Sequence, residues 1–155
     1  MNELYPDFID FLKALAENEV DFAVVGGYAV AFHGHARATK DIDILVRADH
    51  ENAARLYRAL GAFGAPLASL NIHEKDLEAY DGIFQIGKEP KRIDVITNIS
   101  GVNYDEVATG SATFDLDGHQ IRVIGLDALL VNKRASGRLQ DLADVEALER
   151  LHRAK

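Results

Sequence analysis

The sequence contains no cysteine and no tryptophan, and it has only three prolines and one methionine. The absence of cysteine excludes disulfide bonds and thiolate metal sites. The longest apolar stretch runs from Phe22 to Phe32, about half the length that a membrane-spanning helix needs. The N-terminus is acidic and amphipathic, unlike a signal peptide with its basic start and apolar centre. We therefore expect a cytoplasmic location and no membrane partner.

Basic residues are also in the minority: the sequence has 17 lysines and arginines and 25 aspartates and glutamates, which gives a formal net charge of −8. This balance argues against strong non-specific binding to nucleic acid, which depends on neutralising many phosphates. Apolar residues make up 48% of the 155 residues and charged residues 27%, as in an ordinary globular protein. We predict a single domain over residues 1–155, with a core at about 20–125 and C-terminal helices at about 126–152.

Hydrophobic periodicity and turn residues predict strands that alternate with helices. The expected strands are 21–25, 41–46, 82–87 and 92–97, followed by a hairpin over 112–124 that turns at Asp117-Gly118. The expected helices are 6–17, a short one ending at Gly34, 49 to about 60, 103–109, and 126–152 with a break near Gly137. Residues 61–66 are expected to form a turn, and 73–79 a helical turn. The fold class is α/β (α+β), with a mixed central sheet flanked by helices and a helical C-terminal tail.

Two aspartates with the spacing i, i+2 stand inside an apolar run. Asp41 and Asp43 would point to the same face of a strand, while Ile42 and Ile44 point into the core. Side-by-side carboxylates repel each other, and a cation usually neutralises them. Asp94 repeats this context, and it would join the pair if strand 92–97 lies beside strand 41–46. The alternative for Asp94 is a salt bridge with Arg92 on the same strand face.

A glycine pair, Gly26-Gly27, follows one predicted strand and precedes a helix. A backbone without side chains can approach a phosphate closely, and a helix N-terminus supplies N–H dipoles. The pattern matches neither the P-loop nor the dinucleotide-binding fingerprint. Its value lies in the combination with the two carboxylates that follow on the next strand.

This combination resembles the nucleotidyltransferase superfamily that has the DNA polymerase beta-like fold. The tract 26–46 is particularly similar to the AbiEii/AbiGii toxin-type branch and related uncharacterised branches. Their Arg-x-Thr-x-Asp-x-Asp string is matched by Arg37, Thr39, Asp41 and Asp43, and a C-terminal segment by Lys133, Arg138, Asp141 and Asp144. The similarity covers most of the chain but is sharp only at 26–46 and 133–144.

The resemblance implies transfer of a nucleoside monophosphate from a triphosphate to an acceptor, with release of pyrophosphate. Asp41, Asp43 and Asp94 would be the catalytic residues and would hold two Mg²⁺ ions. Lys133 would be the cation for the outer phosphates. The residues expected to bind the nucleotide are Gly26, Gly27, Arg37, Thr39, Lys40, Lys133, Arg138 and Asp141.

Several alternatives stay open at this stage. The acceptor could be RNA, including transfer RNA, a partner protein or a small molecule, and the chain could form a homo-oligomer. It could act in a toxin–antitoxin pair, or it could be a non-catalytic antitoxin or regulatory subunit that binds nucleotide or metal. Arg37 and Lys40 could be solvated loop cations. Asp141 and Asp144, three residues apart on a helix, could form a solvated acidic face or pair with Arg138.

Overall fold

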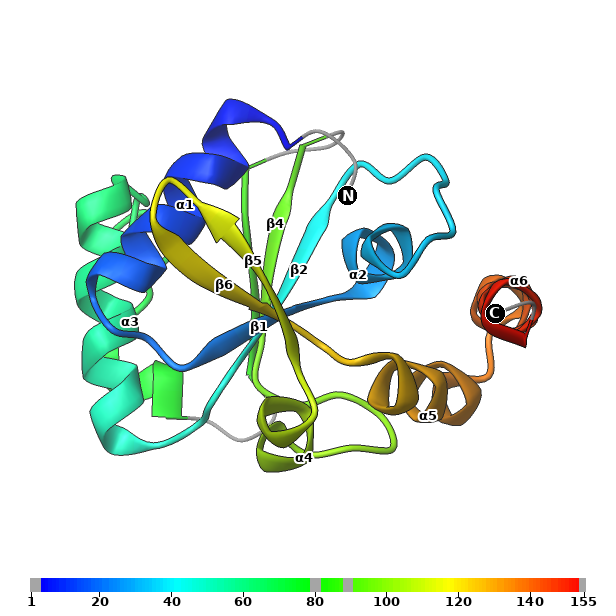
Figure 1. Ribbon diagram of the computed structural model, residues 1–155. Helices are drawn as coiled ribbons and strands as arrows, with labels where there is room; N and C mark the ends of the chain where they lie inside the picture. The colour runs from blue at the N-terminus through cyan, green and yellow to red at the C-terminus, as the bar shows by residue number, and fades with distance from the viewer. Residues whose placement is uncertain (1–3, 79–81, 88–90, 154–155) are drawn as a thin grey trace.

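A computed structural model describes residues 4–78, 82–87 and 91–153. The described strands form one six-stranded mixed sheet in the order β3-β4-β2-β1-β6-β5 (Figure 1). The strands are β1 (Phe22–Val25), β2 (Ile42–Val46), β3 (Ile83–Ile86), β4 (Ile93–Ile96), β5 (Ala112–Leu116) and β6 (His119–Val123). The helices are α1 (Pro6–Glu17), α2 (Gly26–Phe32), α3 (His50–Phe63), α4 (Tyr104–Thr109), α5 (Leu126–Ser136) and α6 (Leu139–Arg153), with a 3₁₀ turn at Glu74–Glu78.

The strand pairing explains why the sheet is mixed. β2 runs antiparallel to β1 and parallel to β4, while β6 runs parallel to β1. The outer strands β3 and β5 pair antiparallel with β4 and β6. Because β2 and β4 are parallel neighbours, side chains at equivalent positions of these two strands stand next to each other. The predicted fold class is thereby confirmed.

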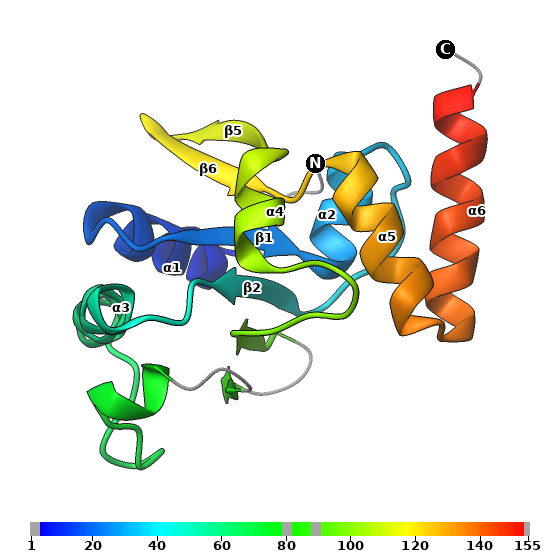
Figure 2. The same cartoon turned by 90° about the horizontal axis from the view of Figure 1, so that it is seen from below.

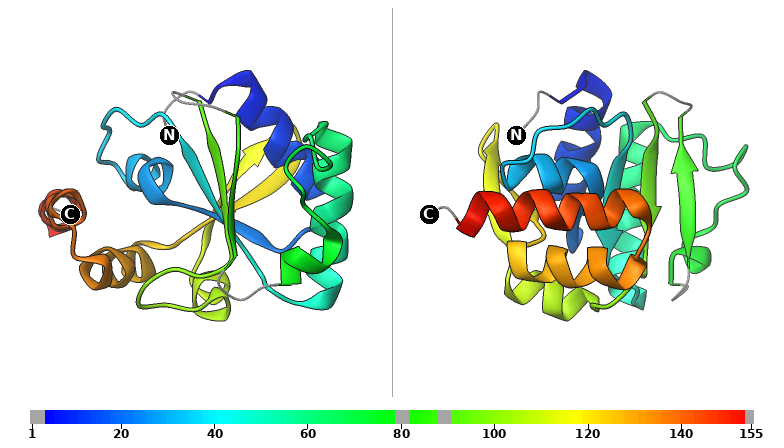
Figure 3. Two further views of the ribbon diagram at one scale, coloured as in Figure 1. Left: turned by 180° about the vertical axis from the view of Figure 1, so that it is seen from behind. Right: turned by 90° about the vertical axis from the view of Figure 1, so that its right-hand side faces the viewer.

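Helices cover the sheet from both sides. α1 and α3 lie together on one side of the twisted sheet, and α2, α5 and α6 lie together on the other (Figures 1 and 2). Figure 3 shows α2, α5 and α6 side by side in front of the strands in its right-hand view. None of the helices in the described part of the chain is long and apolar enough to cross a membrane.

The hydrophobic core follows the predicted periodicity. The stripe of Phe8, Phe11, Leu12 and Leu15 on α1 is fully buried. The apolar residues of β1 and β2 are buried as well, as expected for central strands that are covered on both faces. This rigid centre of the sheet fixes the backbone positions of the acidic residues at the ends of the same strands.

Helix boundaries reflect local chemistry. The side chain of Asp49 accepts a hydrogen bond of 2.7 Å from the backbone N–H of Asn52, which caps α3 as predicted. The same helix continues past the predicted end and stops at Phe63, because Gly64 takes the left-handed conformation with φ +92°. The expected turn at 61–66 is therefore three residues too early. The sequence also predicts a turn at 88–91 between β3 and β4, and most of it lies outside the described residues.

Candidate functional site

A cleft of about 730 Å³ opens where β1, β2 and β4 meet α2, the loop before β2, and the connection between α5 and α6. Its lining includes backbone turns, carboxylates, and arginine and lysine side chains. The candidate catalytic and nucleotide-binding residues all line it, namely Gly26, Gly27, Arg37, Thr39, Lys40, Asp41, Asp43, Asp94, Lys133, Arg138 and Asp141, whereas Asp144 of the same C-terminal segment does not. Residues more than 100 positions apart in the chain thus share one cavity.

Three carboxylates converge on one wall of the cleft. Asp43 of β2 stands directly beside Asp94 of β4 in the parallel register, and Asp41 lies just before β2 begins. Asp94 is only 8% exposed. The expectation that the two strands are neighbours, on which the grouping of these acids depended, is confirmed.

The crowding has an electrostatic consequence for Asp43. Burial, together with the charge and hydrogen bonding of Asp94, raises the pKa of Asp43 from its usual 3.8 to about 7. The nearby charge of Asp41 acts in the same direction, while Lys133 opposes it. Near neutral pH Asp43 is therefore only partly ionised.

Arg92 lies between two of the three acids. Its Nε donates to Asp94 Oδ1 at 2.7 Å, and Nη2 donates to Asp94 Oδ2 at 3.2 Å. Nη2 also lies 3.1 Å from Asp41 Oδ2, and the Arg92 backbone N–H donates to Asp41 Oδ1 at 3.1 Å. The salt bridge with Asp94 considered from the sequence is thus present, and it extends to Asp41. In this arrangement, among the described residues, no three acidic, histidine or cysteine side chains are grouped to hold a metal ion.

The two glycines make room for side chains of the site. Gly26 has φ +69°, and a Cβ at this position would collide with the carboxylate of Asp43. A Cβ on Gly27 would lie 2.5 Å from Thr39 Oγ1. Both positions therefore require glycine for packing against β2 and the loop before it, in addition to any close approach by a ligand.

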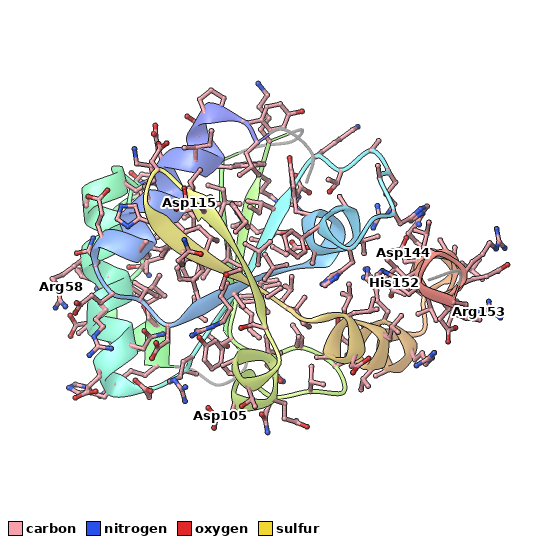
Figure 4. All side chains as sticks on the ribbon, viewed as in Figure 1. Arg58, Asp105, Asp115, Asp144, His152 and Arg153 are labelled. Carbon is pink, nitrogen blue, oxygen red and sulfur yellow. The ribbon has the colours of Figure 1, made fainter. Side chains whose placement is uncertain are left out.

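A second charged cluster joins α5 and α6 at the wall of the cleft. Lys133 Nζ lies 3.1 Å from Asp141 Oδ1 and 3.2 Å from Asp144 Oδ2, and all three side chains are less than a tenth exposed. Arg37 Nε lies 3.0 Å from Asp144 Oδ1, and Arg138 Nε donates to Asp141 Oδ2 at 2.7 Å. Figure 4 shows Asp144 on the side of α6 that faces α2 and its following loop. The open alternative of a solvated acidic face is wrong, because both aspartates are buried.

The pKa of Asp141 reflects this cluster. Burial by itself would raise the pKa of Asp141, but hydrogen bonds from Arg138 and Lys133 hold it below its usual value. Asp141 is therefore ionised at neutral pH and contributes to holding Lys133 in place. Lys133 reaches the cleft wall already paired with two carboxylates.

Comparison with known proteins decides the family. Residues 5–155 match the family described as "Nucleotidyl transferase of unknown function (DUF2204)". The chain belongs to this family. It is a nucleotidyltransferase. No curated protein matches the sequence significantly.

Several solved structures share the fold of this chain. TM1012 of Thermotoga maritima superposes with a TM-score of 0.55 and 14% identity, over 99% of this chain and 97% of its own. The lincosamide antibiotic adenylyltransferase LnuA gives 0.57 and 16%, over 96% and 98%. The antibiotic-resistance factor ANT(2'')-Ia gives 0.51 and 12%, over 96% and 90%. At these identities the likeness establishes the fold, and the predicted similarity to the AbiEii/AbiGii branch stays a prediction.

The sequence did not reveal all the residues that line the cleft of this nucleotidyltransferase. Asn132 donates from Nδ2 to the carbonyl of Ser100 at 2.9 Å, and Gln140 donates from Nε2 to Asp144 Oδ1 at 3.0 Å. These two polar residues line the cleft together with Ser100. Asn132 and Gln140 flank the recognised positions 133 and 141, but single polar residues beside a motif carry no signal of their own.

Proposed function

We propose that the chain transfers a nucleoside monophosphate from a nucleoside triphosphate to an acceptor hydroxyl, with Asp41, Asp43 and Asp94 as its catalytic residues. The observation that carries this proposal is the parallel pairing of β2 with β4, which sets Asp43 beside Asp94 in a cleft that also contains the glycine turn. Three carboxylates on adjacent strand ends, facing a cavity with several cations, suit phosphate chemistry in which positioning and charge neutralisation dominate.

Mg²⁺ is the metal that these carboxylates would hold, and the polymerase beta resemblance leads us to expect two ions. Carboxylate oxygens are the ligands that Mg²⁺ prefers, and Asp43, with its pKa raised first by burial and then by Asp94 and Asp41, is an acid that a bound cation would stabilise in its ionised form. The donor set therefore fits a divalent cation. When bound, the metal would neutralise developing charge on the phosphates and lower the pKa of the acceptor hydroxyl.

The chain's own residues would position the triphosphate. Gly26 and Gly27 form the backbone turn at the start of α2, beside Asp43, where a phosphate can approach closely. Lys40 and Arg138 are exposed at the cleft and supply positive charge to the outer phosphates. Lys133 would act from the wall as a fixed charge, because Asp141 and Asp144 hold its ammonium group in place.

Further nucleotide-binding roles belong to the loop before β2 and to the start of α6. Thr39 donates from Oγ1 to the carbonyl of Asp41 at 3.3 Å and so shapes the approach to the acidic wall. Arg37 lines the cleft and is anchored by Asp144, and Asp141 orients Arg138. These contacts hold the candidate binding residues in place before a nucleotide arrives.

For the acceptor we propose a hydroxyl-bearing small molecule. The cleft volume of about 730 Å³ falls within the range of small-molecule sites, and the net charge of −8 disfavours a long polyanion. LnuA and ANT(2'')-Ia, which share the fold over nearly their whole lengths, are an antibiotic adenylyltransferase and an antibiotic-resistance factor. Their names support a small acceptor without identifying it.

The test is a transfer assay with all four α-labelled ribonucleoside triphosphates, Mg²⁺, and three classes of acceptor. These classes are hydroxyl-bearing antibiotics, transfer RNA, and total cell protein. Labelled small-molecule products that disappear in Asp41→Asn and Asp94→Asn are the expected result. Labelling of transfer RNA or protein instead would reject the small acceptor and favour a toxin role. The absence of any product or pyrophosphate would reject catalysis.

A second function has one specific observation in its favour. Arg92 occupies the space between Asp41 and Asp94, as a permanent counter-ion would in a nucleotide-binding module that does not catalyse transfer. Binding of a triphosphate without turnover, unaffected by Asp41→Asn, would support this module. A loss of both metal binding and turnover in the same variant would exclude it.

A further inference from the structure

Arg92 contacts the carboxylate oxygens of Asp41 and Asp94, two of the three aspartates proposed to hold the metal. Its guanidinium lies 2.7 Å from Asp94 Oδ1 and 3.1 Å from Asp41 Oδ2. The Arg92 side chain is 24% exposed, and those of Asp41 and Asp94 are 22% and 11% exposed. The group is thus enclosed by the cleft wall, and solvent only partly screens its charge.

The guanidinium geometry makes this contact strong. Two of its N–H groups point to the two oxygens of Asp94, a bidentate arrangement that is stronger than a single charged hydrogen bond. The backbone N–H of the same residue holds Asp41, so one residue ties both acids together. The pairing of β2 with β4 places Arg92 there, since the residue precedes β4 and projects on the same face as Asp94.

A guanidinium and a divalent cation would compete for these carboxylates. Mg²⁺ binds carboxylate oxygens at about 2.0–2.1 Å, closer than any hydrogen-bond donor. The positive charge of the Arg92 guanidinium, only a few ångströms from the doubly charged metal, would repel it. At the effective dielectric constant of a protein surface, this repulsion amounts to several kcal/mol. The two cations therefore cannot occupy the Asp41–Asp94 gap together.

We propose that Arg92 is an internal counter-cation that holds Asp41 and Asp94 together in the metal-free enzyme and must leave them when the metal binds. The arginine keeps the acidic wall folded without metal, and in return it lowers the affinity of the site for metal. This inference rests on the proposed function, because it takes Asp41, Asp43 and Asp94 to be the metal site.

The test uses Mn²⁺ as a paramagnetic probe for the metal alone, titrated into the full chain and followed by electron paramagnetic resonance. Arg92→Gln removes the charge, and Arg92→Lys keeps the charge but loses the bidentate fork. Arg134→Gln is the matched control, since Arg134 pairs with Glu149 on the exposed surface of α5 and α6. Thermal unfolding with and without Mn²⁺ is measured on the same samples.

The expected result is that Arg92→Gln binds Mn²⁺ at least about tenfold more tightly than the wild type. Arg92→Lys should show a smaller gain, and Arg134→Gln none. Without metal, Arg92→Gln should melt at a lower temperature than the wild type, and Mn²⁺ should remove most of the difference. If Arg92→Gln does not fold without metal, tighter Mn²⁺ binding by Arg92→Lys carries the same conclusion.

Two outcomes would overturn the inference, and they can be told apart. Equal Mn²⁺ affinity in the wild type and both Arg92 variants would show that Arg92 only forms a structural salt bridge. The proposed metal site itself would not be contradicted by this result. No specific Mn²⁺ binding by any of the proteins, even at millimolar concentration, would remove the metal site and with it the proposed function.

Discussion

Replacing Asp144 with alanine would remove the shared partner of two ion pairs, a buried one with Lys133 and a partly buried one with Arg37. Lys133 Nζ lies 3.2 Å from one oxygen of Asp144, and Arg37 Nε lies 3.0 Å from the other. The Asp144 side chain is 0% exposed, and that of Lys133 is 7% exposed. Water therefore cannot readily replace the lost carboxylate, and the charge of Lys133 would be balanced mainly by Asp141.

The size of the effect follows from this burial. Removing one partner of a buried ion pair costs about 3–5 kcal/mol, because the remaining charge stays desolvated. We expect a value near the lower end, about 3 kcal/mol, since Asp141 still accepts from Lys133. For a protein of this size, that corresponds to a fall in melting temperature of roughly 10 °C.

Chemical denaturation monitored by circular dichroism provides the free energy of unfolding. Glu149→Ala is the control, because its pair with Arg134 is exposed and should contribute at most about 1 kcal/mol. A double-mutant cycle with Lys133→Met should give a coupling energy of about 1–3 kcal/mol between Lys133 and Asp144. An Asp144→Ala variant as stable as Glu149→Ala would refute the claim that this cluster holds α6 against α5.

Two further predictions concern the acidic wall and the glycine turn. In the absence of divalent metal, stability should fall as the pH rises from about 4 to about 7, because Asp43 has its pKa raised from 3.8 to about 7 in the folded chain and favours the neutral form. Urea unfolding from pH 4 to 8 checks this, and Asp43→Asn should flatten that part of the profile; an unchanged slope would contradict it. Gly26→Ala should lower the melting temperature and reduce transfer activity, because the backbone angle φ of +69° and the Asp43 carboxylate both oppose a Cβ atom at this position. Gly61→Ala in α3 is the control: its Cβ would meet no atom within 4 Å, and the substitution should be neutral or stabilising.

The placement of the acidic residues on their strands was largely predictable from the sequence, because it depends on local periodicity. The i, i+2 spacing of Asp41 and Asp43 fixes their common face, and the apolar residues of both strands indicate central positions. Only the neighbour relation of β2 and β4 had to be assumed before Asp94 could be added. The structure supplies that relation through the pairing of Asp43 with Asp94.

The charged cluster of Lys133, Asp141 and Asp144 was less predictable, because it depends on how α5 and α6 pack. The i, i+3 spacing of Asp141 and Asp144 shows a shared helix face, but it does not show whether that face meets solvent or another helix. Burial against Lys133 on α5 answers this. The sequence also did not reveal that Arg92 contacts Asp41 as well as Asp94. The contact with Asp41 depends on the pairing of β2 with β4, which local sequence spacing does not show.

The central claim is that this nucleotidyltransferase uses Asp41, Asp43 and Asp94 to transfer a nucleoside monophosphate. The most direct measurement compares α-labelled and γ-labelled triphosphate in one reaction with Mg²⁺, for the wild type and for Asp43→Asn. The account predicts that the α-label enters the acceptor, that the γ-label leaves as pyrophosphate in equal amount, and that Asp43→Asn loses both by at least about a hundredfold. A γ-label on the acceptor, or full transfer by Asp43→Asn, would contradict it.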